Sequence, residues 1–279
     1  MAIGAGTITS EAFNSALEVP SFIDECTTTD FIRPEASTLN TTTVKVLAYE
    51  LDTLSDYDDI AGMTAEAGNG DYVEVALTQN KGIFKVLPGI NAEMISAEMS
   101  GPVFDIFSAN IKNSALALKK GKEVEFVKVL AADGIEDDDT DDLTNETVYE
   151  KFIEAGTTLT TNEVSRIGRY ALVTPAVEGL LLLSPTFIKA GDKGQAVAEN
   201  GLIGFCNGFS VFGTPYLPAQ TEVVFGQKDC ATVVHWSDID PFVENLTGGG
   251  YVNSCAIKGH TKYGAAVKYA KGVFVKKTL

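Results

Sequence analysis

The densest group of chemically active side chains lies between residues 133 and 150, where nine acidic residues occur without a basic one. Asp137-x-Asp139-x-Asp141 has the alternate spacing with which a calcium-binding loop begins. The later positions do not fit, because an aspartate stands where such a loop has glycine and Val148 stands where it has glutamate. The sequence therefore favours a solvated acidic loop over a cation site. It predicts no metal ligand and no cofactor.

The two histidines, His235 and His260, are the next candidates for acid–base chemistry. They lie 25 positions apart, and neither has a nucleophile or carboxylate at a spacing that predicts a catalytic triad. His235 precedes Trp236 in a predicted strand, so we expect a packed side chain rather than a general base.

Motifs that bind phosphate or perform hydrolysis are missing from the sequence. It contains no G-x-x-x-x-G-K-S/T, no G-x-S-x-G and no H-E-x-x-H. Gly4-Ala5-Gly6 lacks the preceding strand and the third glycine of a dinucleotide-binding loop. Together with the isolated histidines, these absences predict a protein that is not an enzyme and has no catalytic residue.

Charge is distributed unevenly along the chain. The 38 acidic and 21 basic residues give a net charge of -17, which repels phosphate backbones, so we expect no tight binding to nucleic acid. Residues 1–59 hold eleven acids and two bases, whereas all the charged residues after Glu244 are lysines. These six are Lys258, Lys262, Lys268, Lys271, Lys276 and Lys277. Their alternation with apolar residues favours a solvated strand face over a phosphate-binding stripe. The oppositely charged ends could pair within one molecule or between copies.

Length and composition bound the class and the compartment. A chain of 279 residues with 45% hydrophobic residues can bury a core without metal or disulfide. Cys26, Cys206, Cys230 and Cys255 form no C-x-x-C pair, so we expect buried reduced thiols. The N-terminus lacks a basic, apolar signal segment, and no stretch reaches the roughly twenty apolar residues of a membrane helix. We expect a cytoplasmic protein without a membrane segment.

The elements that must position these side chains follow from the apolar periodicity, which predicts an α+β fold with a strand-rich C-terminal half. Residues 1–40 show no sustained period and predict an extended arm. Strands at 43–51 and 72–88, joined by the acidic connection 55–70, predict a long hairpin.

Helices are expected next. A helix capped by Asn91 precedes a longer one from Pro102 to Gly121, and Val124–Leu130 alternates like a strand. Further on, we expect a helix that is capped by Thr144, has a Leu143/Val148 staple and places Phe152 and Ile153 on its apolar face. A strand at 169–173 and a helix at 175–183 capped by Thr174 follow. An extended run at 203–211 has Ile203, Phe205, Phe209 and Val211 on one face, and the last strands are expected at 222–225, 231–236, 251–258 and 265–276.

Three segments of the C-terminal half carry a family resemblance. Arg169-Tyr170-Ala171-Leu172-Val173-Thr174-Pro175 leads into an apolar helix, residues 199–211 read E-N-G-L-I-G-F-C-N-G-F-S-V before Tyr216-Leu217-Pro218, and Lys262-Tyr263-Gly264-Ala265-Ala266-Val267 precedes a last strand. In this order they resemble the strand-Pro-helix entry, the "G-x-I-G-x-x-x-G-F-x-V … L-P" strand and the closing "Y-G … V" segment of tailed-bacteriophage major capsid proteins, which have the Hong Kong 97-type fold. The resemblance covers nearly the whole chain in element order and residues 169–276 at the level of motifs.

The resemblance implies a division of the chain. It places an N-terminal arm at 1–40, an extended β-hairpin loop at 41–89, a spine helix with the first part of a peripheral domain at 90–144, an axial domain at 145–220, and late strands shared between both domains at 221–279.

The family also implies a function and partners. The chain would assemble as hexamers and pentamers into an icosahedral shell that encloses double-stranded DNA without sequence-specific binding, located in the virion capsid and assembled in the bacterial host cytoplasm without a membrane. A separate scaffolding protein and a portal are expected partners, with a decoration protein as a further candidate. Some members link a loop lysine to a neighbour's asparagine; Lys81 lies in the loop, but no partner or catalytic glutamate matches, so no crosslink is predicted.

Two alternatives stay open. A cellular nanocompartment shell of the encapsulin type would share the same fold. A soluble enzyme with an unrecognised site is the third class, and it would form a small, discrete oligomer with a pocket of perturbed titratable groups.

Overall fold

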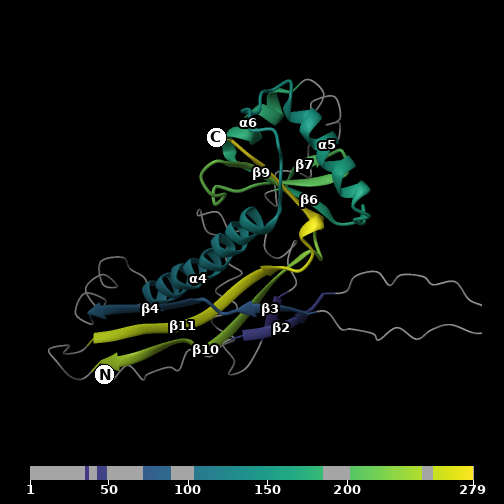
Figure 1. Cartoon of the computed structure of the whole chain (residues 1–279). Helices are drawn as coiled ribbons and strands as arrows, with labels where there is room; N and C mark the ends of the chain where they lie inside the picture. Colours follow the sequence, from purple (N-terminus) through teal and green to yellow (C-terminus); the bar gives the residue numbers. More distant parts are fainter. Residues whose placement is uncertain are drawn as a thin grey trace, which may run out of the picture.

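The computed structural model describes residues 35–37, 43–48, 72–88, 104–184, 202–246 and 254–278. They form two regions, a long sheet with one helix lying along it and a six-stranded sheet packed with two shorter helices (Figure 1). This mixture of helices and sheets confirms the predicted α+β class. Residues 1–34 with Gly4-Ala5-Gly6, the connection 55–70 and the helix expected from Asn91 lie outside the described residues.

The long sheet has the strand order β1-β10-β11-β4. Its strands are β1 (Glu35–Ser37), β10 (Ala231–Leu246), β11 (Ser254–Val267) and β4 (Gln79–Pro88). β10, β11 and β4 are antiparallel to their neighbours, whereas β1 runs parallel to β10 beside Val233–His235. The described end of the expected arm therefore lies on the edge of its own chain's sheet.

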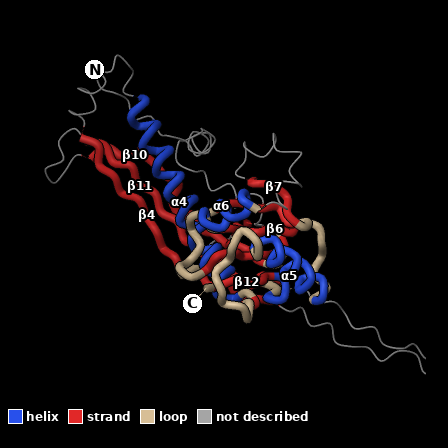
Figure 2. The backbone as a smooth tube through the Cα atoms, turned by 90° about the horizontal axis from the view of Figure 1, so that it is seen from above, coloured by secondary structure: helices blue, strands red, loops and turns tan. Residues whose placement is uncertain are grey.

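A single helix, α4 (Phe104–Asp133), lies along this sheet and continues into the second region (Figures 1 and 2). Its end is buried in the core there, through Phe126, Val127, Leu130 and Ala131. The predicted end at Gly121 and the predicted strand 124–130 are wrong, because the buried positions recur every three to four residues, as one helix face requires. Gly121 does not end the helix; the helix meets Tyr263 of β11 at this residue.

The second sheet has the order β5-β12-β9-β6-β8-β7. Its strands are β5 (Ile135–Glu136), β12 (Val273–Lys277), β9 (Thr221–Gln227), β6 (Arg169–Val173), β8 (Phe209–Gly213) and β7 (Leu202–Cys206), and its helices are α5 (Val148–Thr161) and α6 (Pro175–Leu183). Phe152 of α5 packs edge to face on Phe225 and Phe209, with ring centroids 4.9 and 6.0 Å apart. This cluster of rings fixes α5 on the sheet.

The predicted start of α6 is confirmed, whereas the predicted cap of α5 at Thr144 is wrong, because α5 begins at Val148 and its cap is Thr147, three residues later. Thr144 and Thr147 bond reciprocally, because each hydroxyl accepts from the other residue's backbone N–H, at 3.3 and 3.0 Å. The staple residues Leu143 and Val148 are both buried. Thr174 accepts from the Val177 N–H ahead of Pro175. Ile153, expected on the buried face of α5, is 46% exposed.

Residues 203–211 form a hairpin rather than one extended run. Asn207 and Gly208 have φ values of 47° and 84°, which is the backbone of a two-residue type I′ turn between β7 and β8. Phe205 is 65% exposed and Cys206 is buried, so the predicted face is wrong within β7. The Asn-Gly pair was the overlooked turn signal.

The predicted long hairpin is present at its base. β2 (Thr43–Leu47) pairs antiparallel with β3 (Tyr72–Ala76), and the strand expected at 72–88 is broken between β3 and β4. The hairpin crosses the long sheet at Gly264, where any Cβ would overlap the carbonyl oxygen of Ala76. Glycine is therefore required at residue 264 for this close approach.

The late strands are longer and differently divided than expected. The strand predicted at 231–236 extends to Leu246 in β10. The predicted strands 251–258 and 265–276 become β11, a short 3₁₀ turn at Ala270–Gly272, and β12. Pairing with β4 carries β11 through Gly259, and pairing with β10 carries it through Gly264, although sequence punctuation alone suggested both glycines as breaks.

Candidate functional site

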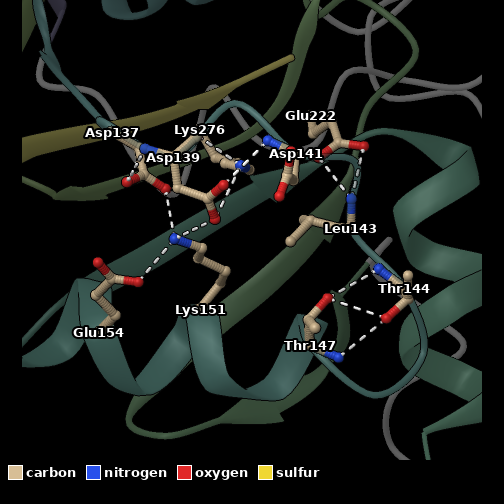
Figure 3. A network of polar contacts seen from close by, with 10 residues as sticks. All are labelled: Asp137, Asp139, Asp141, Leu143, Thr144, Thr147, Lys151, Glu154, Glu222 and Lys276. Atoms are coloured by element: carbon tan, nitrogen blue, oxygen red, sulfur yellow. Dashed lines mark hydrogen bonds and ion pairs between the residues drawn. The ribbon is translucent and has the colours of Figure 1, made fainter.

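The acidic loop, residues 133–142, connects α4 to the turn before α5 and contains β5. Its first turn is tied to the last strand, because the Asp137 N–H donates to the Val275 carbonyl oxygen at 2.9 Å. Within the loop, the Asp139 N–H donates to Asp137 Oδ1 at 3.2 Å and the Asp141 N–H donates to Asp139 Oδ1 at 3.0 Å. These turns direct the Asp137 and Asp139 carboxylates toward α5 (Figure 3).

Lys151 of α5 occupies the point on which the carboxylates converge. Its Nζ lies 2.9 Å from Asp137 Oδ2, 2.8 Å from Asp139 Oδ2 and 2.8 Å from Glu154 Oε2 (Figure 3). The side chains of Lys151 and Asp137 are 11% and 5% exposed. The prediction of a solvated loop is therefore wrong for Asp137, which is buried against an ammonium group. It is confirmed for the exposed Asp138, Asp141 and Asp142.

The loop also fastens the last strand, β12. Lys276 is fully buried, and its Nζ donates to the Asp139 carbonyl oxygen at 2.6 Å and lies 3.4 Å from Asp139 Oδ2. The neighbouring Lys277 pairs with Glu136. Two lysines near the C-terminus are thus neutralised by a loop more than 130 residues earlier in the sequence.

Hydrogen bonding sets the protonation behaviour of this network. The pKa of Asp139 is held well below its ordinary value, chiefly by the hydrogen bond from Lys151 and then by the Asp141 N–H. Burial lowers the pKa of Lys151, but the hydrogen bonds to Asp139, Glu154 and Asp137 outweigh burial and raise it. Glu222, which accepts from the Leu143 N–H, has a pKa raised by burial. Asp139 and Lys151 therefore remain charged over a wide pH range.

The arrangement is suited to holding the chain together rather than to binding a metal. Within the described residues, no group of three or more His, Cys, Asp or Glu side chains is placed to hold a metal ion. The three carboxylates that do converge are occupied by the Lys151 ammonium. Chemically, the network supplies fixed counter-charges between the loop, α5 and β12.

The two histidines lie on neighbouring strands of the long sheet, outside this network. His235 of β10 is half-buried opposite Tyr263 of β11, as expected for a packed side chain. His260 lies three residues before Tyr263, so strand alternation places it on the other face of the sheet. Its Nε2 contacts Asn80 Oδ1 of β4. The structure does not bring the histidines together.

The lysines after Glu244 form no continuous stripe. Lys258 pairs with Glu244 itself, while Lys276 and Lys277 pair with the acidic loop. The prediction of a solvated strand face is wrong for Lys276, which is buried because the loop covers it. Lys81 is exposed on β4 opposite Thr261, within the long sheet.

Two of the four cysteines are described and are buried free thiols, as predicted. Burial raises the pKa of Cys206 to about 12 and that of Cys230 to about 11, so both stay protonated and unreactive at neutral pH. Cys26 and the side chain of Cys255 lie outside the described residues.

Arg169 is an important side chain that the sequence analysis missed. It is buried, and its guanidinium donates to the carbonyl oxygens of Gly156, Ser165 and Val164 at 3.1, 3.0 and 2.6 Å. It thereby satisfies acceptors at the C-terminal end of α5 and in the loop that follows. The only signal was an arginine at the start of an otherwise apolar strand.

Among the described helices, none combines the length and the apolar character that a membrane crossing needs.

Comparison with known proteins identifies the fold. No known family model matches the sequence, and no curated protein matches it. Solved structures do match: a chain of Mycobacterium phage Che8 aligns with a TM-score of 0.63 and 21% identity over 85% of both chains. A chain from the capsid of the Cyanophage P-SCSP1u gives 0.71 and 11% over 94% of this chain and 91% of that one. The virus-like particle from Pyrococcus furiosus gives 0.57 and 11% over 96% of both. The chain therefore has the Hong Kong 97-type capsid fold, as the three motifs between residues 169 and 276 predicted.

Proposed function

We propose that this chain is the major capsid protein of a tailed bacteriophage, which assembles as hexamers and pentamers into an icosahedral shell around double-stranded DNA. The observation that carries the proposal is the agreement in fold with a phage capsid chain over 94% of this chain and 91% of the other. Its role is structural rather than enzymatic.

Exposed apolar side chains on the hairpin support assembly. Leu47 and Tyr72 face each other across β2 and β3 and are 55% and 50% exposed, and Phe84 on β4 is 62% exposed. Among the described strands β4 lies at the edge of its sheet, and an exposed edge strand is available for pairing with another chain. Within a shell, neighbouring copies would cover these side chains.

The charge of the chain supports a container for DNA. A net charge of -17 keeps packaged DNA from adhering to the wall, and three of the six lysines after Glu244 are neutralised internally. DNA is then held by confinement, without sequence-specific contacts. We propose the virion capsid as the location, with assembly in the bacterial host cytoplasm.

Further partners belong to the same proposal. A closed shell that is filled with DNA needs a portal, and we propose that a separate scaffolding protein guides assembly, with a decoration protein as a further candidate. Efficient formation of regular shells by this chain expressed alone would refute the need for the scaffold.

A cellular nanocompartment shell is the second candidate, because it would share the same fold; the match to the virus-like particle from Pyrococcus furiosus shows that fold without favouring this function over the phage capsid. The contents of purified particles separate the two functions. A bacteriophage capsid is expected to protect double-stranded DNA from nuclease, whereas a nanocompartment is expected to retain a protein cargo and no genome. Particles with cargo enzyme and no DNA would overturn the phage assignment but not the fold.

A further inference from the structure

Three connections meet at the C-terminal end of α5, and we call residues 162–168, 227–230 and 268–272 the basic junction. The Asn162 side-chain N–H donates to the Lys271 carbonyl oxygen at 3.2 Å, and that of Gln227 donates to the Ile167 carbonyl oxygen at 3.2 Å. The Lys268 N–H donates to the Cys230 carbonyl oxygen at 2.7 Å. These bonds make one fixed surface from segments that are far apart in the sequence.

This surface is positive although the chain as a whole is strongly negative. Its charged residues are the cations Arg166, Lys228, Lys268 and Lys271 and the carboxylates Glu163 and Asp229, a local net charge of +2 against -17 for the chain. Arg166, Lys228 and Lys271 are exposed, and within the described part of the chain none of the four cations forms an ion pair. Ile167 stands among them with 84% of its surface exposed. A fixed surface that carries unpaired cations and an exposed apolar side chain has the composition of a contact surface.

The cations are not needed to stabilise the end of α5. The buried guanidinium of Arg169 already provides the positive charge there and bonds the Gly156 carbonyl oxygen of the last turns. The exposed cations of the junction are therefore surplus to the folding of one copy.

The opposite end of α5 carries the opposite charge. The acidic loop there keeps Asp138, Asp141 and Asp142 exposed, because the lysines of the network bind Asp137, Asp139 and Glu136 instead. Within the described residues these three carboxylates form no ion pair. The 14 residues of α5 separate the two charged surfaces by about 21 Å along the helix axis. One copy thus presents complementary charges at two ends of the same region.

We propose that the basic junction of one copy binds the exposed carboxylates of the acidic loop of the next copy, head to tail. A contact between two different surfaces of identical chains is heterologous, and it produces a closed ring when the rotation between copies closes. Complementary charge fixes the order and register of such a ring. The inference rests on the proposed function in that these rings would be the hexamers and pentamers of the shell.

Charge reversal on each side tests the contact. Lys228→Glu and Asp142→Lys each place like charges in the contact, and at about 50 mM salt each should raise the protein concentration needed for assembly roughly tenfold. Lys128→Glu, at an exposed position of α4, makes the same charge change as Lys228→Glu away from the proposed contact and should assemble like the wild type. Circular dichroism and thermal melting confirm that each variant is folded. If Lys228→Glu does not fold, Lys228→Gln replaces it with a smaller expected effect.

A mixture of the two variants distinguishes a contact between copies from an effect within one. Lys228→Glu chains mixed in equal amounts with Asp142→Lys chains can alternate around a six-membered ring with every contact complementary, so hexamer formation should recover. Recovery supports the proposal. Two results overturn the proposal. One is assembly of both single variants at the wild-type concentration. The other is failure of the mixture although each variant is folded, which would mean that these charges act within one chain or on the acidic residues near the N-terminus. All assembly assays are run on chains co-expressed with the neighbouring genes of their own genome, so that any scaffold is present. If the wild type forms no shell under those conditions, the proposed function fails instead.

Discussion

Gly121 of α4 faces the hydroxyl of Tyr263 on β11, and a Cβ at residue 121 would lie 2.8 Å from that oxygen. The glycine thus lets the long helix pass close to the sheet that it covers. The helix continues for twelve residues beyond this point and enters the core of the other region. A residue that looked like a helix stop is instead a packing position shared by both regions.

Replacing Gly121 should therefore act against helix propensity. Alanine in a helix interior normally stabilises by about 1 kcal/mol, but here its Cβ must push the Tyr263 hydroxyl away, so Gly121→Ala should gain nothing or lose about 1 kcal/mol. Gly179→Ala in α6 is the matched control, because nothing lies within 4 Å of its Cβ, and it should stabilise. Urea unfolding of both variants measures the difference. Equal stabilisation by both would contradict the close contact.

Gly121 illustrates why the sequence predicted some elements correctly and others not. Elements with local punctuation were predicted well: Thr174-Pro175 starts α6 and Ser184 ends it. The β7–β8 turn had a local signal, Asn207-Gly208, that was overlooked. The failures at Gly121 and at Lys276 share a different cause. Each depends on which segment lies opposite in space, and a 3.6-residue period interrupted by glycine looks the same whether the helix stops or merely approaches a neighbour. The motifs identified the fold because their order spans many elements.

The network around the acidic loop could be predicted only in part, because some of its members are far apart in the sequence. The notable run of aspartates was visible, and so was Lys151 beside it, but nothing local predicted that Lys276 would lie buried on Asp139. Long-range pairing of β12 with β5 brings them together.

Removing the central ammonium of the network should loosen the acidic loop. Lys151→Met leaves the buried Asp137 carboxylate without its counter-charge, and we expect a loss of about 2 kcal/mol because the other carboxylates are partly exposed and remain hydrated. Lys128→Met, at an exposed position of α4, is the control and should change stability by less than about 0.5 kcal/mol. Chemical denaturation measures both. A Lys151→Met variant as stable as the control would show that the network contributes nothing.

The pH dependence of this network has a defined sign. The pKa of Asp139 is lower in the folded chain than its ordinary value of 3.8, so its contribution is complete above that pH and is lost as the pH falls below it. The melting temperatures of the wild type and of Asp139→Asn should differ most at neutral pH, and the difference should shrink progressively as the pH falls below 3.8 toward the lower pKa of the folded chain. A difference that stays constant from pH 7 to pH 2.5 would mean that Asp139 does not titrate with folding.

The crossing of the hairpin over the long sheet depends on Gly264. Gly264→Ala places a methyl group on the Ala76 carbonyl oxygen, and since backbone must move, we expect about 2 kcal/mol of destabilisation confined to this crossing. Hydrogen exchange should become faster in β3 and stay unchanged in the buried strand β6. Gly82→Ala in β4 is the milder comparison, because its Cβ would lie 3.3 Å from the Gly259 carbonyl oxygen, against 2.1 Å from the Ala76 carbonyl oxygen at Gly264, so its effect should be smaller. Unchanged exchange in β3 would contradict the observed crossing.

The central claim is that this fold builds a closed shell, and electron microscopy of the assembled protein tests it most directly. The chain is co-expressed with the neighbouring genes of its own genome, so that any scaffold is present, and the purified material is imaged and its mass determined by light scattering. The account predicts regular, closed icosahedral particles built of hexamers and pentamers. A uniform monomer or small discrete oligomer under these conditions, with no shells at any protein concentration, would contradict it.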